Sequence, residues 1–340
     1  MSQASSRITY FDWLRGAATA AVVLLHEMNM VLSNHQVAEL GTPLYLVWTW
    51  MQIVLVRWAV PCFLMISGAL LLNPKRELGW RKLARYELRM IAVLAVFCPV
   101  YACVSARGVS VAAVLTGLRK ALFQESWDHL WYVYALMGLY LLTPILRGYV
   151  AVAGRAEQRT MLLVLGVVCL LVPTINAAAA TNIPTLVWVG SSLFYYLLGS
   201  YVHRFCRLNG QIALAGTLSL IALLGLSAWL IAGWQWYPLW LIKPACPLTA
   251  LWSTLVYLLA KRHLSGTTPP SALAWLSRHS LGIYLVHPIA LVVLYRRLFW
   301  LPYQPLFPVA FEVVVYALAL GSSVAVVAAL ARIPGLRKIV

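Results

Sequence analysis

The sequence predicts an all-α polytopic membrane protein with about ten transmembrane helices. Of its residues 62% are hydrophobic and only 10% are charged, whereas a soluble globular domain has about 25% charged residues. The 15 Trp and 17 Tyr residues suit the aromatic belts that form at the two surfaces of a bilayer. A soluble fold with this composition would have too little polar side-chain area to cover its surface.

Apolar stretches of about 20 residues mark the individual spans. The first stretch is too long and too polar for a cleaved signal peptide, so we expect a permanent helix there. The second is overlong and contains Pro61, which predicts a kink, tilt or break. The loops are too short for a separate soluble domain, and residues 1–340 are predicted to form a single membrane-embedded domain. The predicted spans are residues 14–32, 44–72, 88–104, 129–147, 160–177, 185–203, 211–232, 238–260, 279–299 and 306–331.

The net charge of +17 is distributed unevenly over the predicted loops. Most of the Lys and Arg residues lie on the side that holds both termini, so the positive-inside rule places both termini in the cytoplasm. The basic surplus is therefore a topology signal, and no nucleic-acid partner is predicted. Part of it could also serve anionic membrane lipid or an anionic cofactor.

Two loops and the six cysteines carry further information about the chain. Residues 73–86 form the most basic loop, and residues 111–123 are predicted to hold an amphipathic or re-entrant piece. The six Cys residues mostly lie in apolar stretches without a CxxC pair, as buried small hydrophobes do. No phosphate-binding glycine loop, zinc-ligand spacing or GxSxG elbow is present, and we predict no metal.

Arg15 and His26 are polar residues within the first apolar stretch. At about 100° and about 1.5 Å per residue, they share one helix face about 16 Å apart. Ionisable side chains are costly in lipid and are more often functional than structural. A neutral imidazole at this depth can act as a general base, although Arg15 could instead extend to the lipid headgroups.

Further polar residues surround this pair in the sequence. Glu27 and Asn29 extend the polar part of the first helix, and Glu27 could orient the imidazole only through another rotamer or a water. Arg57 precedes Pro61 by one turn, which favours a distorted helix lining a polar cavity. The alternative for Arg57 is the outer membrane interface.

Two later segments carry polar and aromatic side chains at predicted helix ends. His129 and Trp131 open the fourth span, where the pattern alone is that of an aromatic belt. Ser277 and Arg278 lie at the predicted cytoplasmic entrance of the ninth span, and Tyr284 follows on roughly one face with Ser280 and His287. Arg278 could hold a phosphate or could simply set the topology.

Four segments in the same order resemble the integral-membrane acyltransferase-3 family. Arg15 and His26 match its R-x10-H signature, and RWAVPCFLMISGALLL resembles its R-x-x-V-P-x-F-F-x-x-S-G segment, with Leu64 as a departure. HLWYVYALMGLYLLTPI and SRHSLGIYLVH resemble two more. The all-membrane form is most similar to the branch that contains the enterobacterial common antigen O-acetyltransferase.

The resemblance implies transfer of an acyl group, most simply acetyl, from cytoplasmic acetyl-CoA to a carbohydrate or lipid-linked glycan in the bacterial inner membrane. It implies that His26 is the catalytic histidine, that Arg15 is the essential basic residue, and that Arg57, which matches the family's second-span arginine, is also catalytic. We assign Arg15, Arg278, Ser277 and Tyr284 to acyl-CoA binding. We assign acceptor binding to four residues: Asn29, Glu27, His129 and Trp131.

A transporter or exporter of a small glycan or anion is the competing prediction, because charged residues can also line a transport pathway. It predicts flux without consumption of acyl-CoA. The absence of a convincing repeat between the halves of the sequence favours the enzyme.

Overall fold

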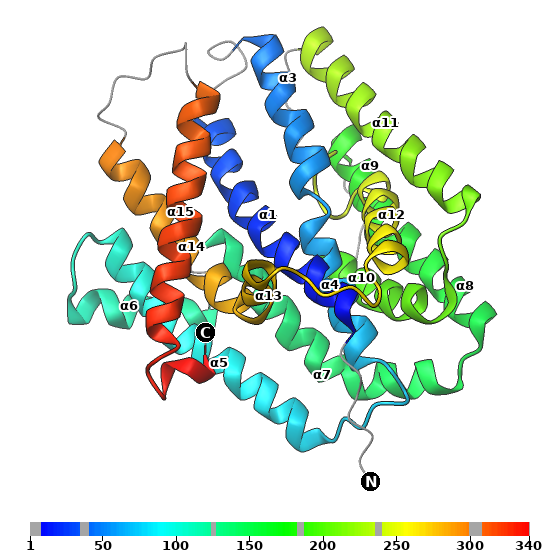
Figure 1. The fold of residues 1–340 in the computed structure, drawn as a ribbon, viewed down its shortest axis with the longest axis horizontal. Helices are drawn as coiled ribbons and strands as arrows, with labels where there is room; N and C mark the ends of the chain where they lie inside the picture. The colour runs from blue at the N-terminus through cyan, green and yellow to red at the C-terminus, as the bar shows by residue number, and fades with distance from the viewer. Residues whose placement is uncertain are drawn as a thin grey trace. The chain divides into compact units, whose positions relative to one another are not determined.

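The computed structural model describes residues 8–34, 41–123, 127–181, 187–234, 240–298 and 308–339. Within these ranges the secondary structure is helical throughout, which confirms the predicted all-α class (Figure 1). The contacts divide the chain into two compact units, each built from separated stretches of sequence. The prediction of one domain over residues 1–340 stays a prediction.

The first unit contains residues 1–70, 153–280 and 303–317. Within it α1 packs along α13, and α11 packs along α12. Its helices and π turns are α1 (Thr9–Asn34), α3 (Thr42–Met51), η1 (Gln52–Val56), α4 (Ala59–Leu71), α8 (Arg155–Gly166), η3 (Val167–Leu171), α9 (Val172–Ala179), α10 (Val187–Phe205), α11 (Gly210–Trp234), α12 (Pro247–His263), α13 (Ser271–Arg278) and the first part of α15 (Pro308–Leu330).

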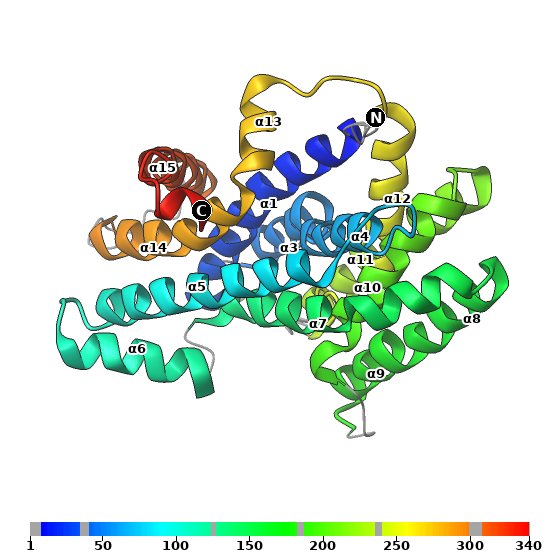
Figure 2. The same ribbon diagram turned by 90° about the horizontal axis from the view of Figure 1, so that it is seen from below.

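The second unit contains residues 71–152, 281–302 and 318–340. Figure 2 shows α5 and α6 side by side, joined by a short turn. The predicted helix at residues 111–123 is present as α6, and it buries only Ala113 and Gly117 along a narrow stripe. The elements of this unit are α5 (Trp80–Ser105), α6 (Val111–Phe123), η2 (Asp128–Leu130), α7 (Trp131–Val152), α14 (Ser280–Leu298), the rest of α15 and η4 (Leu336–Lys338).

Six of the described helices are long and apolar enough to cross a membrane, and the α13–α14 pair would be a seventh if counted as one broken span. Helix α1 is not among these six. The ten-span count and the cytoplasmic placement of the termini stay predictions.

Apolar side chains cover the outer faces of several of these helices. Leu214, Leu218 and Ile221 recur at helical spacing on α11 and are more than half exposed. Exposed apolar stripes of this kind are costly in water and favourable against lipid acyl chains. The exposed faces therefore agree with the predicted membrane location.

The second predicted span is interrupted, as its proline suggested, but the irregularity lies before Pro61. Residues 52–56 form a π turn that closes with a hydrogen bond of 3.1 Å from the Arg57 amide to the Gln52 carbonyl. Helix α4 then begins at Ala59, so Pro61 lies in its first turn, where a missing N–H leaves no helical hydrogen bond unmade.

Two other predicted boundaries differ from the structure. Helix α5 begins at Trp80 rather than at residue 88, because Leu83 turns inward while the neighbouring Arg81 and Arg85 side chains stay outside. Helix α12 begins only at Pro247, after turns at residues 240–246. Tyr195 donates to the Pro244 carbonyl at 2.6 Å and Thr174 to the Ala245 carbonyl at 3.1 Å, which satisfies backbone that is not helical.

Glycines set the closest approach of α4 and α10. A Cβ atom at Gly68 would lie 1.7 Å from the Tyr196 carbonyl oxygen, and one at Gly199 would lie 2.0 Å from the Met65 carbonyl oxygen. Small residues allow two helix backbones to meet in this way. The SG pair in the second span therefore marks a close helix crossing.

Candidate active site

The start of α1 is fastened to α13 and to the turn that precedes it. The Ser277 hydroxyl donates to the Asp12 carboxylate at 3.0 Å, and the Thr9 hydroxyl donates to the Leu264 carbonyl at 3.2 Å. A Cβ atom at Gly16 would lie 2.4 Å from the Leu273 carbonyl oxygen, so the two helices are nearly in backbone contact. These contacts fix the part of α1 that carries Arg15.

The residues assigned to acyl-CoA phosphates occupy different settings in this region. Arg15 is half-buried on α1, one residue before Gly16. Ser277 is buried and bonded to Asp12, so its hydroxyl positions α13 against α1. Arg278 is exposed at the last residue of α13. Arg15 and Arg278 are thus the accessible cations of this group.

His26 lies farther along α1 and is half-buried, with the Arg57 guanidinium close enough to interact with it electrostatically. Arg57 comes directly after the π turn of residues 52–56. Such turns insert one residue into a helix and often occur at functional sites. Here the turn brings a side chain of the second predicted span to the imidazole of the first.

A hydrogen-bonded triangle holds the Arg57 guanidinium. Its Nη2 donates to the Asn29 Oδ1 at 3.0 Å and also to the Gln52 Oε1. Gln52 Nε2 donates to the same Asn29 oxygen at 3.1 Å, and Gln52 is fully buried. Two amides therefore orient one cation beside the candidate base.

Glu27 lies outside this triangle. It is fully buried, and its carboxyl is close to that of Glu312 in α15. Its assignment to acceptor binding stays a prediction.

In the second unit a buried cluster gathers around His129. Its imidazole Nε2 is hydrogen-bonded to the Tyr101 hydroxyl at 3.0 Å, and that hydroxyl donates to the Leu285 carbonyl at 2.7 Å. Tyr284 donates to the His129 carbonyl, and the His287 ring centre lies 6.1 Å from that of His129. The cluster joins the start of α7 to α14, and Trp131 lies half-buried beside it in sequence.

The structure brings His26 and Asn29 together with Arg57 in the first unit, and His129 with Tyr284 in the second. Sequence reasoning did not include Gln52, Tyr101 or Glu312 in the site. Gln52 carried a usable signal, since it is a lone amide in an apolar stretch five residues before Arg57. Among the described residues no group of three or more His, Cys, Asp or Glu could hold a metal ion.

The comparisons with known proteins bear on what this arrangement does. A family model described as an acyltransferase domain, that of the acyltransferase-3 family, matches residues 8–332. A comparison with curated proteins and one with solved structures gave no match. The matched range includes all the candidate residues of both units.

Proposed function

The chain belongs to the acyltransferase-3 family, and from this premise we propose that it transfers an acetyl group from cytoplasmic acetyl-CoA to a hydroxyl of a glycan or lipid-linked sugar. Acyl transfer from a donor to an acceptor is what the family does. The identity of the donor and acceptor, the location in a bacterial inner membrane and the role of each residue belong to the proposal.

His26 is the general base in this proposal. Its imidazole takes the proton of the acceptor hydroxyl while the hydroxyl oxygen attacks the thioester carbonyl carbon. The carbon–sulfur bond then breaks, and the protonated imidazole returns the proton to the coenzyme A thiolate. The acceptor leaves as an ester, and atoms and charge balance without a covalent acyl-enzyme.

Arg57 stabilises the negative charge that develops on the thioester oxygen. A donor that is oriented before the reaction stabilises the transition state without reorganisation, and a single such donor is worth about 100-fold to 1,000-fold in rate. The observation that supports the proposal is that the Arg57 charge lies close enough to act electrostatically on His26, with Asn29 and Gln52 holding the guanidinium in place.

The remaining residues bind the two substrates. Arg15 and Arg278 attract the donor phosphates. Ser277 positions the helix that carries Arg278, and Tyr284 contacts the donor. Asn29 and Glu27 of the first unit, and His129 and Trp131 of the second, are assigned to acceptor binding.

The deciding experiment measures release of free coenzyme A from acetyl-CoA by purified protein in lipid nanodiscs, with a membrane extract as acceptor source. We expect the wild type to turn over and His26→Ala to lose at least about 100-fold in rate while still binding acetyl-CoA. His263→Ala is the matched control, because His263 is an exposed histidine at the end of α12. Turnover by His26→Ala at the wild-type rate would remove His26 from the mechanism.

If wild-type protein neither binds nor consumes acetyl-CoA, the donor assignment is wrong. Other acyl-CoA donors are then tested in the same assay. Failure of all of them, together with flux of a labelled glycan across proteoliposomes, would favour the transporter.

A further inference from the structure

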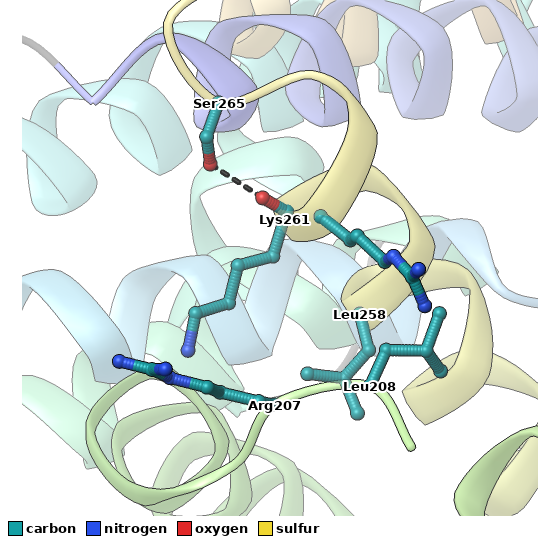
Figure 3. A pocket seen from close by; sticks show the side chains of 6 residues that line it. Arg207, Leu208, Leu258, Lys261 and Ser265 are labelled. Atoms are coloured by element: carbon teal, nitrogen blue, oxygen red, sulfur yellow. Dashed lines mark hydrogen bonds between the residues drawn. The ribbon is translucent and has the colours of Figure 1, made fainter. Parts of the chain in front are cut away.

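A basic cavity of about 340 Å³ lies in the first unit, away from the polar side chains of α1, and none of the roles above uses it. Six side chains line it (Figure 3), and none of them is acidic: Arg207, Leu208, Leu258, Lys261, Arg262 and Ser265. Its volume falls within the range of small-molecule sites, about 300–1,000 Å³. Three cations around one cavity, with no acidic side chain in its lining, indicate an anionic ligand.

Lys261 builds the wall of this cavity. Its ammonium donates to the carbonyls of Val202, His203 and Cys206 at 3.1, 2.8 and 2.8 Å. Val202 and His203 lie in the last turn of α10 and Cys206 directly follows it, and the C-terminal end of a helix attracts a cation. All three of its donors are engaged, so Lys261 fixes the geometry and supplies charge rather than hydrogen bonds.

Arg207 and Arg262 are the two cations that can reach a ligand. Both are exposed, and among the described residues neither has a hydrogen bond or an ion pair. Arg207 is also close enough to Lys261 for the two positive charges to repel each other, as Figure 3 shows in the approach of the two side chains. A bound anion would relieve this repulsion, and the planar guanidinium fork matches phosphate oxygens.

The cavity is connected to the helix that carries the candidate base. Ser265 donates to the Lys261 carbonyl, and the next residue, Gly266, donates its amide to the Thr9 hydroxyl at 2.9 Å. Thr9 is the first residue of α1, and His26 lies about 25 Å farther along that helix at about 1.5 Å per residue. The cavity is therefore joined by hydrogen bonds to the start of the helix that carries His26.

We propose that Arg207 and Arg262 form a phosphate-ester site. Two sources share this chemistry. One is the adenosine phosphates of the acyl-CoA donor, an assignment that rests on the proposed function. The other is the headgroup of an anionic phospholipid, an assignment that is independent of it. Leu208 and Leu258 provide an apolar surface for the part of the ligand next to the phosphate. Both loops that form the cavity lie on the predicted cytoplasmic side, where either source is present.

The test compares full-length wild type with Arg207→Gln/Arg262→Gln in nanodiscs of neutral phosphatidylcholine. The dissociation constants for coenzyme A and 3′-dephospho-coenzyme A are measured by titration calorimetry. We expect coenzyme A to bind at least about ten-fold more weakly to the double variant, because two charge-assisted contacts are lost. In turnover the KM for acetyl-CoA should rise while kcat changes little.

Arg159→Gln/Arg204→Gln is the charge-matched control. It removes two exposed cations that do not line the cavity, and coenzyme A should bind to it as to the wild type. Thermal unfolding of every variant checks the fold. Because Arg207 and Arg262 are exposed and form no hydrogen bond or ion pair with the part of the chain that the structure describes, we expect no loss of stability.

The lipid arm uses nanodiscs with and without phosphatidylglycerol, and native mass spectrometry counts the anionic lipids that stay bound. Loss of bound phosphatidylglycerol in the double variant, with unchanged coenzyme A affinity, supports the phosphate site and identifies the lipid as its source. If the double variant binds both coenzyme A and phosphatidylglycerol as the wild type does, the proposal is overturned. If the wild type does not bind coenzyme A at all, the proposed function fails. The measurement with phosphatidylglycerol alone then decides whether the phosphate site exists.

Discussion

The sequence singles out Arg57 as a candidate site residue, but it does not show which side chains Arg57 contacts. The arginine stands out because a guanidinium in an apolar stretch is costly. Its alternative placement at the outer interface stays a prediction, and in the structure the side chain is hydrogen-bonded to Asn29 and Gln52. The bond to Asn29 links two separate predicted spans, so no pattern within one span could show it.

At Arg57 we expect Arg57→Ala to lower kcat by about 100-fold to 1,000-fold, the usual effect of removing one donor to an oxyanion. The KM for acetyl-CoA should change little, because the contact strengthens in the transition state. Steady-state kinetics of coenzyme A release measure both. Arg57→Lys keeps the charge without the planar fork, so its rate should fall between the other two.

An equal loss in kcat for Arg57→Lys and Arg57→Ala would show that the fork geometry, and not charge alone, is essential. A kcat for Arg57→Ala within about three-fold of the wild type would contradict the assigned role, since one donor is worth far more.

At the scale of elements, irregular helices place the polar groups. The π turn at residues 52–56 directs Arg57 toward α1, and a second one at residues 167–171 precedes Pro173. A proline follows each π turn, Pro61 in the first turn of α4 and Pro173 in the first turn of α9. Pro61 and Pro173 indicate irregular helices. The type of irregularity depends on which backbone carbonyls accept hydrogen bonds from other donors.

The α4–α10 crossing gives a prediction at this scale. We expect Gly68→Ala to destabilise the protein by about 1–3 kcal/mol or more, because the added methyl would overlap the Tyr196 backbone. Thermal unfolding in a fixed detergent measures the change. Gly225→Ala in α11 is the matched control, since nothing lies within 4 Å of its Cβ position and alanine favours a helix interior.

A neutral result for Gly68→Ala, equal to that of Gly225→Ala, would mean that α4 and α10 do not approach as closely as described. Activity of the surviving Gly68→Ala protein is a second measurement. Because α4 follows Arg57 directly, a displaced α4 should also lower kcat.

At the scale of the whole molecule, topology is the prediction that most constrains the mechanism. Donor phosphates can reach Arg15, Arg278 and the 340 Å³ cavity from the cytoplasm only if both termini are cytoplasmic. The excess of Lys and Arg on that side favours this arrangement. We expect single cysteines introduced at Arg207 and Arg278 in a cysteine-free background to react with an impermeant maleimide only in permeabilised cells.

A cysteine at Arg119 serves as the opposite control, because the predicted outer loop should be labelled in intact cells. Labelling of the Arg207 cysteine in intact cells would contradict the predicted topology and place this residue on the outer side. It would also place the proposed phosphate site on the wrong side for acyl-CoA.

The sequence by itself determined the all-helical membrane class, the family, and the polar residues of the first and second spans. Composition and apolar length are properties of the chain alone, because lipid demands them of any crossing helix. The tertiary structure was needed to show that Asn29 holds Arg57 near His26 and that Tyr284 donates to the His129 carbonyl. In both cases the partners lie on different helices, and contact between helices depends on where turns, glycines and prolines let the backbones meet.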